Sequence, residues 1–423
     1  MPTHPDGHRH SSGALSRPPR WAPPVGSLAV SSTRSGPPIG VPYDRGNESV
    51  DGMVRVDTRW IVRTRKALTM TIPISVLDLA PIAPGQTVGD SLANSVRLAQ
   101  AAESSGYTRV WYAEHHNMSS IASSATSVLI GHVADHTSTI RLGSGGVMLP
   151  NHSPLAIAEQ FGTLAELHPG RIDLGLGRAP GSDQNTARAM RRDPRSSDQF
   201  PEDVLELQAF LRGESIVPGV QAVPGGGTDV PLYILGSSLF GAQLAAAFGL
   251  PYAFASHFAP GALHEAMSLY RSEFRPSRQL AEPYAIAAVN VIAAEDEADA
   301  RLQFETARRS RVRSLITRSS SSKEAAPTNT APTNTAPINT APIRYTDDQI
   351  DTFLTTPEGR NIANMTRYSA VGTPSQVRTF LDEFAGAVNA DELILAHQSP
   401  DIDDRLRSVT LTADAMRCLQ PVQ

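Results

Sequence analysis

Eight short apolar runs recur along the chain, and the segments between them show the 3.6-residue spacing of amphipathic helices. Most of the runs are apolar at consecutive positions, which is typical of strands buried on both faces in a parallel sheet. This alternation predicts a (β/α)8 barrel with insertions, and an open doubly wound sheet is the alternative. The predicted strands are 74–80, 109–113, 140–149, 171–177, 231–235, 252–256, 284–294 and 391–396.

Several of the predicted helices have recognisable ends. The first, at about 87–105, carries one apolar stripe, and Gly106 suits its C-terminal cap. The helix after 140–149 opens with Ser153 as N-cap and Pro154 at its first position. Further helices are predicted at about 122–136, 200–212, 238–248, 261–273, 296–316, 375–386 and 401–417.

Two segments show neither period. Residues 1–69 are rich in Pro, Ser, Gly and Arg, so we expect a disordered N-terminal extension and take Met70 as the natural start. Residues 319–343 contain "APTNTAPTNTAPINTAPI", a five-residue repeat that predicts an extended, solvated low-complexity loop. The barrel domain is then expected to span 70–423.

Composition excludes several classes of function. A net charge of -5 over 423 residues gives no reason to expect a nucleic-acid partner. No run approaches the ~20 apolar residues of a membrane span, and no secretory signal is recognisable, so we expect a cytoplasmic protein. Cys418 is the one cysteine, which excludes an internal disulfide and a cysteine zinc cluster; we expect it to be inert.

Polar residues gather where the predicted strands end, which is where barrel enzymes carry their chemistry. Glu114, His115 and His116 follow the second strand directly. This cluster could be a metal site, a proton-transfer site or a coincidence. A metal would need a third convergent ligand, and no metal is predicted. His132 and His136, four residues apart, lack the Glu of a metalloprotease helix. Other polar residues at strand exits are Asp78, Asn151, His152, Arg178, Ser237, Ser238, His257, Asn290 and His397.

Three further patterns suit a ligand with a phosphate and a planar ring. Arg178 could grip a phosphate, or instead pair with Asp173 or Asp183. "LGSSLFG" (235–241) places Ser237 and Ser238 at a helix N-terminus, where backbone N–H groups bind anions but where the same residues also cap any helix. "GSGG" (143–146) predicts a bulge and a wall without side chains, against which a planar ring could lie; a tight barrel corner is the alternative.

Long stretches of the chain resemble the bacterial luciferase-like, flavin-dependent monooxygenases. They are "YAEHHN", "IRLGSGGVMLPNHSPLAIAEQFGTLAELHPGRIDLGLGRAPGSD" and "LGSSLFGAQLAAAFGLPYAFASHF". The resemblance covers about 72–317 and resumes at "RYSAVGTPSQV" (367–377). It implies a (β/α)8 barrel, usually a homodimer, that takes FMN, often as reduced FMNH2 from a separate flavin reductase. It also implies reaction with O2 through a C4a-peroxyflavin that oxygenates an organic small molecule.

The resemblance also assigns roles to residues. His115 matches the catalytic histidine near the flavin, and its imidazole suits proton exchange near neutral pH. Glu114 and His116 are expected to orient it or face the substrate. Arg178 and Ser238, with Ser237 beside them, match the FMN phosphate site. Gly145 and Gly146 match a pair that carries an unusual cis peptide beside the flavin ring.

The chain also departs from the family pattern. Gly241 stands where some relatives place a phosphate-binding threonine, and glycine has no side chain to make that contact. Gly177 stands where luciferase has a reactive cysteine, so light emission is not expected. The 319–343 repeat lies where the family carries a mobile insertion near the active site. Two alternatives stay open: hydride transfer with a deazaflavin on the same fold, and a non-catalytic flavin-binding protein.

Overall fold

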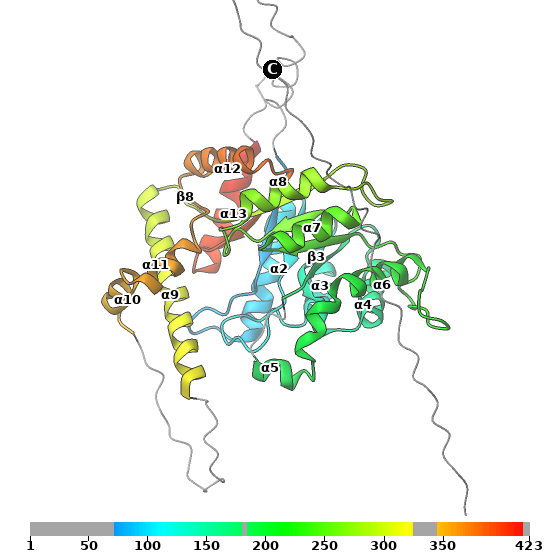
Figure 1. Cartoon of the computed structure of the whole chain (residues 1–423). Helices are drawn as coiled ribbons and strands as arrows, with labels where there is room; N and C mark the ends of the chain where they lie inside the picture. Colours follow the sequence, from blue (N-terminus) through cyan, green and yellow to red (C-terminus); the bar gives the residue numbers. More distant parts are fainter. Residues whose placement is uncertain (1–71, 180–183, 325–344, 418–423) are drawn as a thin grey trace, which may run out of the picture. The chain divides into compact units, whose positions relative to one another are not determined.

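The computed structural model describes residues 72–179, 184–324 and 345–417, and its strands form one parallel sheet that closes on itself. The barrel strands follow the chain around the ring, and the last, β9, pairs with both β1 and β7, which closes it. The predicted (β/α)8 barrel is therefore confirmed (Figure 1). The barrel strands are β1 (Ile74–Asp78), β2 (Arg109–Tyr112), β3 (Arg141–Met148), β4 (Ile172–Gly177), β5 (Leu232–Gly236), β6 (Tyr252–Phe254), β7 (Ala285–Ala293) and β9 (Glu392–His397).

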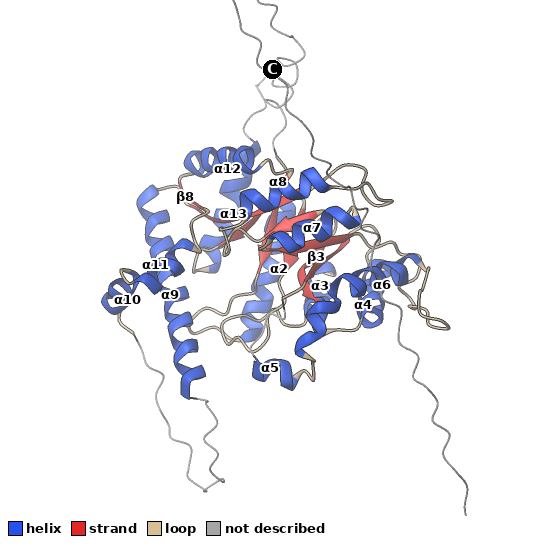
Figure 2. Cartoon of the chain, in the orientation of Figure 1, coloured by secondary structure: helices blue, strands red, loops and turns tan. Residues whose placement is uncertain are grey.

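Helices surround this sheet, and in Figure 2 the strands lie inside a shell of helices. Two predicted helix ends are confirmed: Ser153 accepts a hydrogen bond from the Ala156 N–H, and Gly106 follows the first helix at φ 73°. The helices are α2 (Val88–Ser104), α3 (Thr126–Ala134), α4 (Pro154–Leu167), α5 (Gln184–Ala189), α6 (Phe200–Arg212), α7 (Leu239–Phe248), α8 (Leu263–Glu273), α9 (Glu297–Glu324), α10 (Asp347–Leu354), α11 (Pro357–Asn364), α12 (Pro374–Val388) and α13 (Ile402–Arg417), with 3-10 turns η1 (Leu149–Asn151) and η2 (Pro194–Gln199).

The structure differs from the sequence prediction in a few places. Strand β8 (Ser369–Gly372) was not predicted, and it pairs with β7 beyond the point where β6 ends. Helices α5, α10 and α11 were also missed, and α3 is shorter than the predicted 122–136. Helix α9 continues to Glu324, so the predicted loop 319–343 starts as helix. The predictions for 1–69, for most of that loop and for Cys418 lie outside the described residues.

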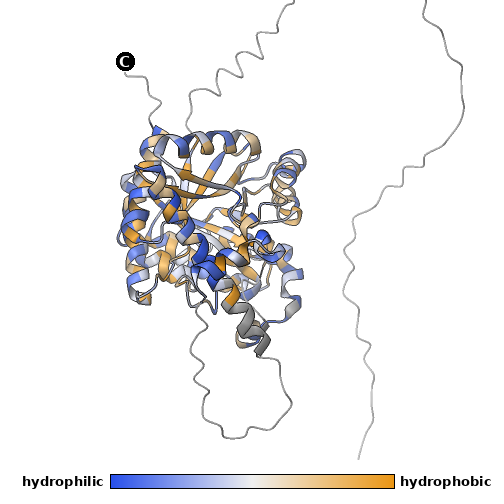
Figure 3. Ribbon diagram, turned by 90° about the vertical axis from the view of Figure 1, so that its left-hand side faces the viewer, coloured by the Kyte–Doolittle hydropathy of each residue, from blue (hydrophilic) through white to orange (hydrophobic). Residues whose placement is uncertain are grey.

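The main hydrophobic core lies between the strands and the helices. Outward side chains of the strands, such as Val110, Leu142 and Leu395, are fully buried against apolar helix faces. Figure 3 shows the strands as predominantly hydrophobic and the outer faces of the helices as mixed or hydrophilic. Helices α9, α10 and α11 gather at one side of the barrel in Figure 1, where Val312, Ile350 and Leu354 form a small core of their own.

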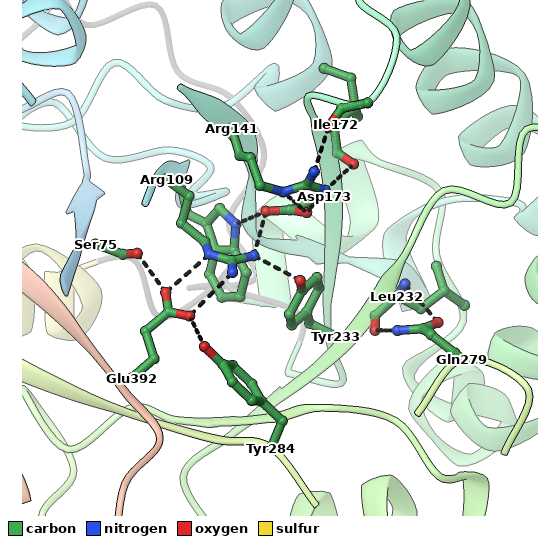
Figure 4. Close-up of polar contacts among 12 residues, drawn as sticks. Ser75, Arg109, Arg141, Ile172, Asp173, Leu232, Tyr233, Gln279, Tyr284 and Glu392 are labelled. Carbon is green, nitrogen blue, oxygen red and sulfur yellow. Dashed lines mark hydrogen bonds and ion pairs between the residues drawn. The ribbon is translucent and has the colours of Figure 1, made fainter. Parts of the chain in front are cut away.

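A network of buried charges fills the end of the barrel where the strands begin (Figure 4). The Arg109 guanidinium donates to Asp173 at 2.7 Å and to both carboxylate oxygens of Glu392 at 3.0 and 3.1 Å. Arg109 also donates to the Tyr233 hydroxyl at 2.7 Å, and the Tyr284 hydroxyl donates to Glu392 at 2.7 Å. Burial disfavours the Arg109 charge, but the two carboxylates outweigh this and raise its pKa. This network therefore belongs to the fold.

Within the described residues, no helix is long and apolar enough to cross a membrane.

Candidate active site at the carboxyl ends of the strands

Two of the polar residues at strand exits face away from the barrel interior. On β9, Ile394 and Ala396 point inward, so His397 points toward the helices, where its Nδ1 lies 2.8 Å from the Ser408 hydroxyl. Asp78 accepts from the Ser95 hydroxyl of α2 at 2.6 Å. Burial lowers the pKa of His397 to about 3. His397 and Asp78, which the sequence showed only as polar residues at strand exits, thus hold helices α13 and α2 to the barrel.

Glu114 organises the polar loop after β2. Its side chain is only 1% exposed, and its carboxylate accepts from His116 Nε2 at 2.8 Å, from His152 Nε2 at 2.9 Å and from the Met148 N–H at 3.0 Å. The loop after β2 is thereby tied to the end of β3 and to η1. Burial alone would raise the pKa of Glu114, but these hydrogen bonds lower it to about 2.

The ionised Glu114 also fixes the two histidine rings. A carboxylate only accepts hydrogen bonds, so both Nε2 atoms carry a proton. Each Nδ1 then points away from Glu114 and is a hydrogen-bond acceptor whenever its ring is neutral. His116 was named from the sequence. His152 was noted only as a strand-exit residue, because the 38 positions that separate it from Glu114 hide their contact.

A second histidine pair lies around the ends of β2 and β6. The His115 backbone N–H donates to the Ser123 carbonyl at 3.0 Å, which fixes the loop around it. His257 is buried, and burial, followed by the charges of Arg311 and His115, lowers its pKa to about 3. His257 is therefore neutral at ordinary pH. His115 and Arg311 both lie close enough for their charges to act on its ring.

Two buried polar atoms in this region lack a hydrogen-bond partner in the described part of the chain. They are His257 Nδ1 and Asn290 Oδ1. Asn290 donates its Nδ2 to the His257 carbonyl at 2.8 Å, so its Oδ1 is turned away from that carbonyl. An unsatisfied buried polar group costs about 1–3 kcal/mol, and such groups at a barrel mouth are typical of ligand sites.

The glycines of β3 lie where neighbouring strands come closest. The pairing with β4 shifts register between Ser144 and Val147, which confirms the predicted bulge. The Gly145–Gly146 peptide bond is cis. A Cβ on Gly145 would lie 2.8 Å from Leu77, and one on Gly146 would lie 2.7 Å from the Gly175 carbonyl oxygen. Barrel packing therefore requires both glycines, and their contact with a flavin ring stays a prediction.

Arg178 and the start of α7 lie together. Gly177 pairs with Leu235, so the ends of β4 and β5 are level, and the Arg178 guanidinium lies 4.1 Å from the centre of the Phe240 ring. Ser238 is the N-cap of α7, yet its side chain makes no capping hydrogen bond. Asp173 is engaged by Arg109 at the other end of the barrel, which excludes it as the partner of Arg178. The side chain of Asp183 lies outside the described residues.

These groups suit an anionic ligand without a metal. Arg178 brings a positive charge, and the first N–H groups of α7 lack a side-chain acceptor, so both can donate to one phosphate. In the part of the chain that the structure describes, no cluster of three or more His, Cys, Asp or Glu side chains could hold a metal ion. His132 of α3 and His136, which follows that helix, are both exposed, with ring centres 4.6 Å apart.

The comparisons with known proteins decide the family. The luciferase-like monooxygenase profile matches residues 72–389. The chain belongs to the luciferase-like monooxygenase family. It is 46% identical over 345 residues to a luciferase-like monooxygenase of Escherichia coli K12, covering 81% of this chain and 97% of the relative. It is 42% identical over 195 residues to an N-acetyl-S-alkylcysteine monooxygenase of Bacillus subtilis, covering 44% of this chain and 57% of that one.

Solved structures show the same barrel. Apo-MsnO8 superposes with a TM-score of 0.69 at 35% identity, covering 83% of this chain and 99% of that one. The oxygenating constituent of 3,6-diketocamphane monooxygenase, in complex with FMN, has a TM-score of 0.60 at 15% identity, covering 83% and 100%. An F420-dependent secondary alcohol dehydrogenase has a TM-score of 0.57 at 15% identity, covering 82% and 100%. The last two share the fold alone. The family match and the curated relatives make this chain an oxidoreductase of the monooxygenase family.

Proposed function

We propose that the chain is an FMN-dependent monooxygenase that uses reduced FMN and O2 to oxygenate an organic small molecule. The observation that carries the cofactor is the pairing of Arg178 with the uncapped N-terminus of α7 in a luciferase-like barrel. An anion site between the ends of β4 and β5 suits the FMN phosphate. Bound flavin would supply the electrons that activate O2, while the protein orients the reactants and keeps water away.

In this proposal, residues of the chain take distinct roles. Arg178, Ser237 and Ser238 hold the phosphate, and Gly145 and Gly146 lie beside the flavin ring. His115 exchanges a proton near the reacting centre, in a loop fixed by the Ser123 carbonyl. Glu114 acts through others, because it positions His116 and His152 on the substrate side.

The proposal extends to the partners of the chain. The family relationship supports a separate flavin reductase, a homodimer and a cytoplasmic location. The relative from Bacillus subtilis is named for an N-acetyl-S-alkylcysteine, which supports a small organic substrate.

The test is a titration of the full chain with FMN, anaerobically reduced FMN and a deazaflavin, followed by fluorescence. Arg178→Ala should weaken FMN binding by about tenfold or more, because charge-assisted hydrogen bonds are worth roughly 1.5–3 kcal/mol each. The same substitution should change the affinity for riboflavin only a little, because riboflavin lacks the phosphate. Arg195→Ala is the matched control, since Arg195 is exposed and already paired with Asp193. Preference for deazaflavin would instead support hydride transfer.

A second measurement separates catalysis from simple flavin binding. His115→Ala should bind FMN and lose oxygen-dependent product formation. Unchanged product formation in this variant would remove His115 from the reaction. Flavin binding without oxygen-dependent product in the wild type would support the non-catalytic alternative.

A further inference from the structure

Helix α9 carries four arginines between positions 308 and 313, and only one of them has no acidic partner among the described residues. Arg308 pairs with Glu305, Arg309 with Asp351 at 2.6 Å, and Arg313 with Asp347 at 2.8 Å. The charges of those three arginines are therefore compensated within α9 and α10. The exception is Arg311.

Arg311 is directed to a different neighbourhood. Val312, the next residue, is fully buried against Ile350 and Leu354 of α10, so Arg311 lies on a different side of the helix. Its side chain is partly buried, burial lowers its pKa, and its charge acts on His257 at the end of β6. A positive charge removed from water without an anionic partner is costly, so it calls for an anion.

The surroundings define what kind of anion would fit. His257 Nδ1 and Asn290 Oδ1 are buried and unpartnered, so each can form a hydrogen bond with a neutral part of a ligand. Phe258, whose ring centre lies 4.9 Å from that of His257, is 39% exposed and offers an apolar surface. The region therefore offers one cation, two neutral polar groups and an aromatic ring.

We propose that Arg311 binds the carboxylate of the organic substrate, so that the substrates of this enzyme are apolar organic acids. His257 and Asn290 then form hydrogen bonds with the polar part of the substrate, and Phe258 contacts its apolar part. The proposal rests on the proposed monooxygenase function. A flavin phosphate would satisfy Arg311 by the same chemistry, but Arg178 and α7 already supply a phosphate site at β4 and β5.

The experiment compares carboxylates with their uncharged amides. Hexanoate, octanoate and phenylacetate, with the matching amides, are titrated into the full chain by calorimetry, with and without bound FMN. The wild type should prefer each carboxylate to its amide. Arg311→Met should weaken carboxylate binding by about tenfold or more, because the charge-assisted hydrogen bonds are lost, and leave amide binding unchanged. Arg311→Lys should recover part of the loss, since it restores the charge.

Arg313→Met is the matched control, because it removes a charge two residues away that Asp347 already compensates. Far-ultraviolet circular dichroism and thermal unfolding of each variant establish that it folds. Equal binding of carboxylates and amides by the wild type, or unchanged carboxylate binding in Arg311→Met, would overturn the proposal.

The experiment also distinguishes the two anions that Arg311 could bind, a substrate carboxylate and the flavin phosphate. If Arg311 held the flavin phosphate, Arg311→Met would weaken FMN more than riboflavin and leave carboxylate binding unchanged. Failure to bind any flavin would count against the proposed function. The titrations without FMN would still decide the role of Arg311.

Discussion

The two ends of the barrel both bury polar groups, but they satisfy them differently. Where the strands begin, Arg109 and Arg141 balance the charges of Asp173 and Glu392, and tyrosine hydroxyls complete their hydrogen bonds. Where the strands end, His257 Nδ1 and Asn290 Oδ1 have no partner in the described part of the chain. A polar cluster that is complete within the protein stabilises the fold, and one that is incomplete is suited to a ligand.

The Glu114 cluster shows that a location at one end of the barrel does not by itself distinguish a structural polar cluster from a ligand-binding one. It lies at the functional end of the barrel, yet its carboxylate is fully engaged by His116, His152 and the Met148 N–H. The protein thus completes the hydrogen bonds of Glu114, and the histidine Nδ1 atoms face away from it. Completeness of hydrogen bonding, rather than location, identifies which groups are available to a ligand.

The largest effect is expected from breaking the complete network. Arg109→Met leaves the buried Glu392 without its cation and Asp173 with Arg141 alone, and both carboxylate side chains have no exposed surface. Removal of one partner from a buried ion pair costs about 3–5 kcal/mol. Urea unfolding should show a loss of this size in the free energy of unfolding, while FMN affinity per folded molecule stays unchanged.

An exposed pair provides the control for this prediction. Arg97 of α2 and Asp403 of α13 form an ion pair between two helices, but their side chains are 47% and 77% exposed. Arg97→Met should cost less than about 1 kcal/mol because water screens the pair. Equal losses for the two substitutions would contradict a structural role for the Arg109 network.

The sequence was sufficient to predict the barrel because its strands are apolar at consecutive positions. Strand β8 escaped prediction because "SAVG" is four residues long and pairs only along the far end of β7. Helices α10 and α11 are eight residues each, which is too short for a clear helical period. The length of α9 was missed because its last residues are serines rather than an apolar stripe.

The candidate site was predictable in position but not in its pairings. Strand exits pointed to Glu114, His115 and Arg178, because parallel strands bring their carboxyl ends together. The sequence could not show which strand-exit residues face the interior: His397 on β9 is turned toward α13, and a shift of one residue would reverse the face. The sequence did not single out Arg311. What sets it apart from the neighbouring arginines of α9 is that it lacks an acidic partner among the described residues, and only the fold determines which residues pair.

A smaller effect, dependent on pH, is expected from Glu114. Its pKa is lowered from the usual 4.5 to about 2 in the folded chain, so the unfolded chain binds more protons between these values. Its contribution to stability, about 3 kcal/mol, is therefore present above pH 4.5 and lost as the pH falls toward 2. Unfolding free energies measured across this range should fall less steeply for Glu114→Gln. Parallel curves for the two proteins would contradict the assigned hydrogen bonds.

The smallest effect on stability is expected where hydrogen bonding is incomplete. Asn290→Leu removes one hydrogen bond to the His257 carbonyl, but it also removes an Oδ1 atom that is buried without a donor. The two effects are of similar size and opposite sign, so the free energy of unfolding should change by no more than about 1 kcal/mol. Carboxylate affinity, measured in the same variant by calorimetry, should fall instead. A loss of stability as large as that of Arg109→Met, with carboxylate affinity unchanged, would place Asn290 with the structural network and remove it from the site.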